Sequence, residues 1–211
     1  MGTDKSATGV AFSRTLGGNK GVQSIRNTEE ADIALKSNDR VMKMRAAKSS
    51  LTSNCALIDY LDGEYQLRTF DYQKAALINL QGRTLTAGEA KHAIASDNLD
   101  VRKCGLNSPN ISNKLLIQYI CSSLGGYHTA PEEMRDLSEM AFRKLQGRAL
   151  TADEAVTALE NNWDSGTAVK LQLMAINSPS VPTEALVRFT KGPHLRMSID
   201  AALEVIKHRS K

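Results

Sequence analysis

The sequence predicts an all-α protein built as a short array of helical repeats. The strings LQGRTLTAGEAKHAI, from Leu80, and LQGRALTADEAVTAL, from Leu145, repeat at an offset of 65 residues. Around both strings, apolar residues recur at spacings of three and four, as they do on one face of a helix. Aromatic residues make up only 5% of the chain, so the core is left to Ala, Leu, Ile, Met and Val, which suit close helix packing.

Each copy of the repeat begins with a helix. Its apolar stripe is clearest in the second copy, at Leu137, Met140, Ala141, Phe142 and Leu145. The string TAPEE at 129–133 has the Pro and the acidic residues that are typical of a helix start. Gly82 and Gly147 follow the two stripes, and we expect each to adopt the left-handed conformation of a C-terminal cap. An arginine, Arg83 or Arg148, lies in each of the turns that follow.

A second helix follows each turn directly. Thr86-x-x-Glu89 and Thr151-x-x-Glu154 have the spacing of capping boxes, in which the threonine hydroxyl and the glutamate carboxylate bind backbone amides that otherwise lack partners. The repeated strings are therefore predicted to be corners between two helices. They are alike because both corners need the same stereochemistry.

A third, fainter copy aligns residues 27–61 with residues 86–120 at an offset of 59. Asn27 and Glu30 then stand at the capping-box positions. We predict a single α-helical repeat domain over about residues 27–211. It consists of three units of about 60–65 residues, each containing a helix–turn–helix, at about residues 27–70, 71–127 and 128–211.

A shared Asn-Ser-Pro string, at 107–109 and 177–179, is typical of a helix end that turns into the next helix. Near the first of these strings the chain resembles the leucine-rich repeat variant and HEAT-like group of α-helical solenoids, at Asp97, Val101, Arg102, Asn107, Pro109, Leu115 and Leu116. The resemblance implies stacked helix pairs, because one short pair cannot bury its apolar face alone. It implies no cofactor, since the iron–sulfur cysteine cluster of some variant-repeat proteins has no counterpart here.

Residues 1–26 are polar, contain five glycines and lack apolar periodicity. They predict a flexible, basic N-terminal arm before the repeat domain. The glycines at 17–21 lack the preceding strand and the GK[ST] ending of a phosphate-binding loop. No apolar run has the length of a signal peptide or of a membrane span, so we expect a cytoplasmic protein without a membrane partner.

The residue types that carry catalysis or bind metals show no functional spacing. Cys55, Cys104 and Cys121 contain no CxxC pair, which disfavours both a disulfide framework and a zinc site. The four histidines form no HxxxH or HxH pair, and no serine stands in a nucleophile elbow. We therefore expect a non-enzymatic protein with no metal and no cofactor.

Positive charge is concentrated in three segments. The chain has a net charge of +4, but residues 1–28 carry +3, residues 36–48 carry +4 and residues 188–211 carry +4, so the remainder carries −7. The first predicted partner-binding site comprises Arg40, Lys43, Arg45 and Lys48. A secondary site comprises Arg188, Lys191, Arg196, Lys207, Arg209 and Lys211. Long cationic side chains also coat ordinary solvated helices, and the charge alone leaves that interpretation open.

Two classes of function remain. The first is a binding or adaptor protein that holds an acidic protein surface, or part of a larger protein assembly, on its helical repeats, or that acts as an inhibitor. The alternative is sequence-nonspecific binding of nucleic acid through the basic N-terminal and C-terminal segments. Salt separates the two, because binding driven by phosphate contacts weakens steeply as the salt concentration rises.

Overall fold

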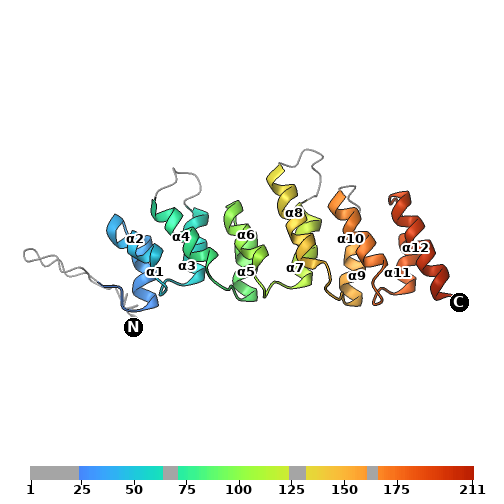
Figure 1. The fold of residues 1–211 in the computed structure, drawn as a ribbon, viewed down its shortest axis with the longest axis horizontal. Helices are drawn as coiled ribbons and strands as arrows, with labels where there is room; N and C mark the ends of the chain where they lie inside the picture. The colour runs from blue at the N-terminus through green and yellow to red at the C-terminus, as the bar shows by residue number, and fades with distance from the viewer. Residues whose placement is uncertain (1–23, 64–70, 124–131, 161–165) are drawn as a thin grey trace, which may run out of the picture.

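The computed structural model describes residues 24–63, 71–123, 132–160 and 166–211, and every regular element in these ranges is an α-helix. The predicted all-α class is therefore confirmed. Most of the predicted N-terminal arm, residues 1–23, lies outside the described residues. Figure 1 shows the helices as an elongated row, with α1 and α2 at one end and α11 and α12 at the other.

The helices are α1 (Thr28–Lys36), α2 (Arg40–Lys48), α3 (Asn54–Gly63), α4 (Asp71–Gln81), α5 (Ala87–Ala95), α6 (Leu99–Asn107), α7 (Asn113–Ser123), α8 (Glu132–Leu145), α9 (Ala152–Leu159), α10 (Gly166–Ile176), α11 (Thr183–Phe189) and α12 (Arg196–Arg209). Consecutive helices pack as pairs, from α1–α2 to α11–α12. Between successive pairs, odd-numbered helices contact odd-numbered helices, and even-numbered helices contact even-numbered helices. We call these two sets the odd layer and the even layer.

The sequence offsets of 59 and 65 correspond to two helix pairs, so the array has a period of four helices. Position by position, α1, α5 and α9 are equivalent, and so are α2, α6 and α10, then α3, α7 and α11, then α4, α8 and α12. The predicted unit boundaries after residues 70 and 127 fall between α3 and α4 and between α7 and α8, outside the described residues. The limits of the units stay a prediction of the sequence.

Both predicted capping boxes are confirmed. The Glu89 N–H donates to Thr86 Oγ1 at 3.3 Å, and the Thr86 N–H donates to Glu89 Oε2 at 2.8 Å. The same two bonds join Thr151 and Glu154, at 3.3 and 2.9 Å. These threonines fix where α5 and α9 begin, and hence the corners between successive helix pairs.

The fainter first copy keeps only half of this arrangement. Asn27 accepts a hydrogen bond from the Glu30 N–H at 2.8 Å. The Glu30 carboxylate, however, accepts from the N–H of Arg26 at 2.8 Å rather than from Asn27. The helix start at residue 27 was predicted correctly, but the reciprocal bond is displaced by one residue.

The two predicted glycine caps differ. Gly147 has φ of 78°, so its left-handed conformation is confirmed. Gly82 does not have a positive φ, and the prediction for it is wrong. The N–H of Gly82 donates to the Ile78 carbonyl at 3.2 Å, so Gly82 continues the helical turn at the end of α4. The next N–H behaves alike at both corners, because that of Arg83 donates to the Leu80 carbonyl at 3.1 Å and that of Arg148 to the Leu145 carbonyl at 3.0 Å.

The Asn-Ser-Pro strings end helices as predicted. The Ser108 N–H donates to the Gly105 carbonyl at 3.1 Å, and the Ser178 N–H donates to the Ala175 carbonyl at 3.0 Å. The start predicted from TAPEE agrees with the beginning of α8 at Glu132, although residues 124–131 lie outside the described ranges.

Candidate partner-binding surfaces

The first predicted site lies on α2, in the even layer. Arg40 and Lys48 are exposed, whereas Lys43 and Arg45 are half-buried. The structure therefore presents two of the four predicted side chains fully to solvent. The other two reach the surface only in part.

Lys43 serves packing. Its Nζ lies 5.4 Å from the ring centre of Tyr60 and 5.2 Å from that of Tyr72, which are cation–π distances. Arg102 in α6 and Gln172 in α10 occupy the equivalent position, and they form hydrogen bonds to side chains of α8 and α12. This position holds one even helix against the next in all three units.

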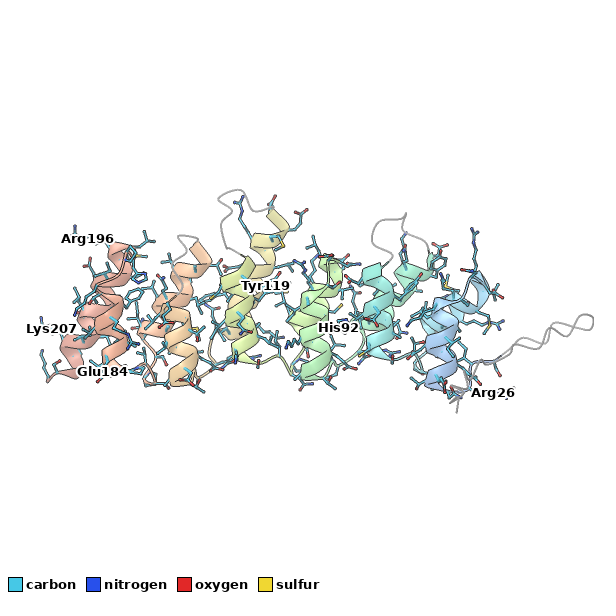
Figure 2. The ribbon with its side chains drawn as sticks, turned by 180° about the vertical axis from the view of Figure 1, so that it is seen from behind. Arg26, His92, Tyr119, Glu184, Arg196 and Lys207 are labelled. Carbon is cyan, nitrogen blue, oxygen red and sulfur yellow. The ribbon has the colours of Figure 1, made fainter. Side chains whose placement is uncertain are left out.

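The secondary predicted site consists of exposed residues, namely Arg188, Lys191, Arg196, Lys207, Arg209 and Lys211. They do not form one patch, because Arg188 belongs to α11 in the odd layer, whereas Arg196 and Lys207 belong to α12. Figure 2 shows Arg196 and Lys207 near opposite ends of α12. Arg196 Nε also lies 3.8 Å from Asp200 Oδ2, an exposed ion pair within the helix.

Arg209 turns its guanidinium back onto the fold. It donates to the carbonyl oxygens of Val181 and of Ser178, the latter at 3.0 Å, in the α10–α11 turn. Arg83 and Arg148 make the same kind of contact with the α2–α3 and α6–α7 turns. We call this contact, which recurs with the four-helix period, the arginine clamp. The guanidinium of Arg209, which was predicted to bind a partner, thus donates hydrogen bonds within the array.

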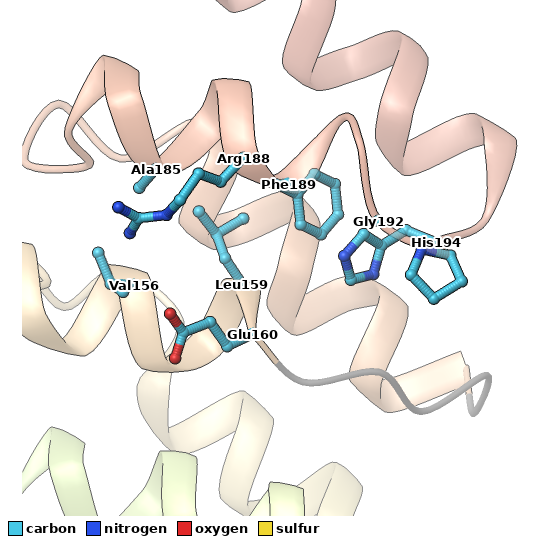
Figure 3. Close-up of a pocket in the computed structure, with 9 residues that line it drawn as sticks. Val156, Leu159, Glu160, Ala185, Arg188, Phe189, Gly192 and His194 are labelled. Atoms are coloured by element: carbon cyan, nitrogen blue, oxygen red, sulfur yellow. The ribbon is translucent and has the colours of Figure 1, made fainter.

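An open groove that the sequence did not predict lies between α9 and α11 in the odd layer. Its volume is about 320 Å³, and its apolar lining consists of Val156, Leu159, Ala185, Phe189 and Pro193. Figure 3 shows Arg188, from α11, and Glu160, after α9, on two sides of the groove. The side chain of Arg188 makes no hydrogen bond or ion pair with any described residue. The groove therefore combines apolar walls with an available cation.

A stacked pair of rings closes one end of this groove. The rings of Phe189 and His194 lie 3.9 Å apart with an interplanar angle of 15°. Gly192 permits this packing, because a Cβ there would lie 2.6 Å from His194 Nε2. Burial lowers the pKa of His194, so the neutral ring is favoured near pH 7. Its buried Nδ1 has no hydrogen-bond partner within the described ranges.

A similar groove recurs one period earlier, between α5 and α7, with a volume of about 390 Å³, and Arg102 of α6 and Met134 of α8 also line it. Its residues Ile94, Ala95, Leu115 and Tyr119 stand at the positions of Leu159, Glu160, Ala185 and Phe189. The exposed cation lies on the other wall of this groove, because Lys91 on α5 replaces Val156 and Gln118 on α7 replaces Arg188. The side chain of Lys91 is exposed and, like that of Arg188, forms no hydrogen bond or ion pair with the described residues.

Carboxylates border the N-terminal half of the odd layer. Asp59 Oδ1 lies 3.0 Å from His92 Nε2. The Ser96 hydroxyl donates to Asp62 at 2.6 Å, and this bond lowers the pKa of that carboxyl. Burial, together with nearby carboxylates, raises the pKa of the Cys55 thiol. Negative charge at this end of the odd layer repels phosphate.

The remaining thiols are poor nucleophiles. Cys104 and Cys121 are half-buried, and burial raises the pKa of each to about 11, so both thiols are protonated at neutral pH. In the described ranges, no three His, Cys, Asp or Glu side chains are arranged to hold a metal ion. None of the helices in those ranges combines the length and the apolar character that a membrane crossing requires.

Comparisons with protein-family models, with curated proteins and with solved structures find no match to this chain. Its function is therefore inferred from the geometry and charge of its own surfaces.

Proposed function

We propose that this chain is a non-enzymatic binding protein that holds an extended, acidic segment of a partner protein along its odd layer. The observation that supports this proposal is the recurrence of one groove, at α5–α7 and again at α9–α11. Because the two grooves are one four-helix period apart on the same layer, a single extended segment can occupy both.

The lining of the grooves indicates the chemistry of that segment. Volumes of about 320 and 390 Å³ lie at the lower end of the roughly 300–1,000 Å³ of small-molecule pockets, and they suit an inserted side chain. The apolar walls would bury an aliphatic or aromatic residue of the partner. Lys91 and Arg188 at the rims would pair with a neighbouring carboxylate, which Arg188 can bind through two parallel hydrogen bonds.

Nucleic acid fits this layer less well. Glu160 lines the groove between α9 and α11, and Asp59 and Asp62 are exposed on the same layer. These carboxylates repel a uniformly negative backbone, whereas a polypeptide can match mixed charges. The exposed Arg40 and Lys48 of α2 keep binding of nucleic acid to the even layer as the second candidate function.

Selection of peptides from a random display library on the immobilised full chain tests the proposal. We expect enrichment of sequences that place Asp or Glu beside a large apolar residue. Lys91→Glu and Arg188→Glu should each weaken the binding of a selected, fluorescein-labelled peptide at least about tenfold, which is about 1.4 kcal/mol. Lys74→Glu is the matched control, because Lys74 is an exposed lysine of α4 in the even layer, and it should bind like wild type.

Two results would contradict the proposal. One is a selected peptide that binds both groove variants as tightly as it binds the wild-type chain. The other is a failure to enrich any acidic peptide while a labelled single-stranded oligonucleotide binds with a steep salt dependence. If Arg40→Glu with Lys48→Glu then abolishes oligonucleotide binding, the nucleic-acid function is supported instead.

A further inference from the structure

The C-terminal end of the array leaves apolar side chains uncovered at positions that are buried in the earlier units. Val187 of α11 is 36% exposed. Its equivalents, Ile58 of α3 and Ile117 of α7, are 0% and 1% exposed because further helix pairs follow them. Val187 thus has the side chain of an internal position without the helices that would cover it.

Leu203 of α12 shows the same difference. The arginine clamp and the fully buried Ala141 and Ala202 set the register between α8 and α12, and in this register Leu203 is equivalent to Phe142. Phe142 is 6% exposed, and Lys170 of the following α10 lies over its ring at 5.9 Å. Leu203 is 50% exposed. Its position is therefore one on which a following helix pair would sit.

The N-terminal end shows the complementary feature. Lys170 of α10 and His92 of α5 reach back onto the preceding helix pair, where His92 pairs with Asp59. Their equivalents in the first pair are Val41, 60% exposed, and Ile33, 54% exposed. Two positions that hold polar residues inside the array hold apolar residues in its first helix pair. An outer face of a repeat array that stays in water ordinarily carries polar residues, and the faces of the α1–α2 and α11–α12 pairs depart from that pattern.

We propose that copies of this chain associate head to tail, with the α11–α12 end of one copy stacking on the α1–α2 end of the next. In the register of the array, Val41 of the second copy would lie over Leu203 as Lys170 lies over Phe142. Charge is also compatible, because Asp200 stands in α12 where Glu139, which pairs with Lys170 at 3.0 Å, stands in α8. The α2 end offers exposed cations to that carboxylate.

This geometry favours a second copy as the occupant of these faces. The α11–α12 end has the apolar face on which a following helix pair packs within the array, and the α1–α2 end has the face that packs on a preceding pair. The two halves differ, so the contact is heterologous and does not close. It therefore generates open chains of copies rather than a symmetric dimer. The contact uses the ends of the array and leaves the odd-layer grooves free, so the inference does not rest on the proposed function.

Analytical ultracentrifugation of the full chain over a wide concentration range tests this inference. Wild type should grow beyond a dimer as its concentration rises. Leu203→Asp and Val41→Asp each block one end, so each variant alone should remain a monomer. An equimolar mixture of the two should form a dimer and nothing larger, because each variant keeps one competent end. Ile78→Asp is the matched control, since Ile78 is 68% exposed on α4 in the interior of the array, and it should associate like wild type.

Circular dichroism of every variant establishes that the helices are intact before association is compared. A wild-type chain that stays monomeric at every concentration overturns the inference. So does a Val41→Asp variant that still dimerises on its own, because that result indicates symmetric pairing of C-terminal ends. Equal loss of association in Ile78→Asp would show that exposed apolar residues in general, and not the ends, drive the association.

Discussion

Replacing Gly105 with alanine should destabilise the array, although alanine is the better helix former. Gly105 lies in α6 where that helix packs on α5. A Cβ at this position would lie 2.8 Å from the Ala90 carbonyl oxygen, 2.9 Å from Ile94 Cγ1 and 3.0 Å from Ala93 Cβ. A backbone oxygen and an alanine methyl cannot rotate away, so the two helices must move apart.

The expected magnitude comes from two opposing terms. Removing a glycine from a helix interior stabilises it by about 0.5–1 kcal/mol. Overpacking at a close helix contact costs about 1–3 kcal/mol, so we expect a net loss on the order of 1–2 kcal/mol. Ala46 and Ala175, the equivalents of Gly105, are fully buried alanines, which shows that the other helix pairs leave room for this methyl group. The close approach is specific to α5 and α6.

Urea unfolding followed by far-ultraviolet circular dichroism measures the effect. Because repeat arrays can unfold in parts, transition midpoints and slopes should be compared rather than extrapolated free energies. Gly88→Ala is the control, since Gly88 lies in α5 and a Cβ there would meet nothing within 4 Å. We expect a lower midpoint for Gly105→Ala and an equal or higher one for Gly88→Ala. A midpoint for Gly105→Ala at or above that of wild type would refute the packing contact described for α5 and α6.

Four further substitutions test the turns and the C-terminal groove. Gly147→Val should lower the melting temperature, because a left-handed φ costs a β-branched residue at least about 1–2 kcal/mol, whereas Gly82→Val should have a smaller effect. Equal losses would contradict the backbone conformation found at Gly82. Arg148→Met removes the donors of one arginine clamp and should cost about 1–3 kcal/mol, measured as a lower urea midpoint, and an unchanged midpoint would show that the clamp adds no stability. Burial depresses the pKa of His194 below its ordinary 6.5, so the stability gained from its neutral ring is present above that pH and is lost as the pH falls. His194→Gln should therefore flatten the decline of the urea midpoint between about pH 7 and about pH 5, and an unaltered decline would exclude His194 as its cause.

The features that the sequence predicted correctly are mostly local. A capping box needs only Thr86 and Glu89, three residues apart, and its bonds form whenever a helix begins there. The left-handed cap at Gly82 was predicted by the same local pattern as that at Gly147, yet the Gly82 N–H donates to the Ile78 carbonyl at 3.2 Å and continues the last turn of α4. The arginine clamp was predicted at neither corner, because its contacts depend on how the helix pairs stack, which a local pattern does not encode.

The candidate binding surfaces were harder to predict, because charge does not show what a side chain faces. Lys43 was predicted as a partner-binding residue, yet it lies over two tyrosine rings, and Arg209 was predicted likewise, yet it forms a clamp. The grooves contain few charges and were missed. The sequence nevertheless contained a signal for the grooves. When α5 is aligned with α9, Lys91 takes the position of Val156, so a cation replaces an apolar residue on an otherwise similar face.

Stacking of copies would change how the grooves bind. A head-to-tail contact in the register of the array places α1 of one copy beside α11 of the previous copy, so the odd layer would continue from copy to copy. A partner segment that carries several acidic and apolar anchors could then occupy grooves on more than one copy, and its later contacts would form at the high effective concentration of a tethered ligand. Apparent affinity for such a segment should therefore rise with the concentration of the chain, and Leu203→Asp should remove that rise without altering the affinity for a peptide that fills a single groove. If the affinity for the long segment does not depend on the concentration of the chain, stacking and groove binding operate separately.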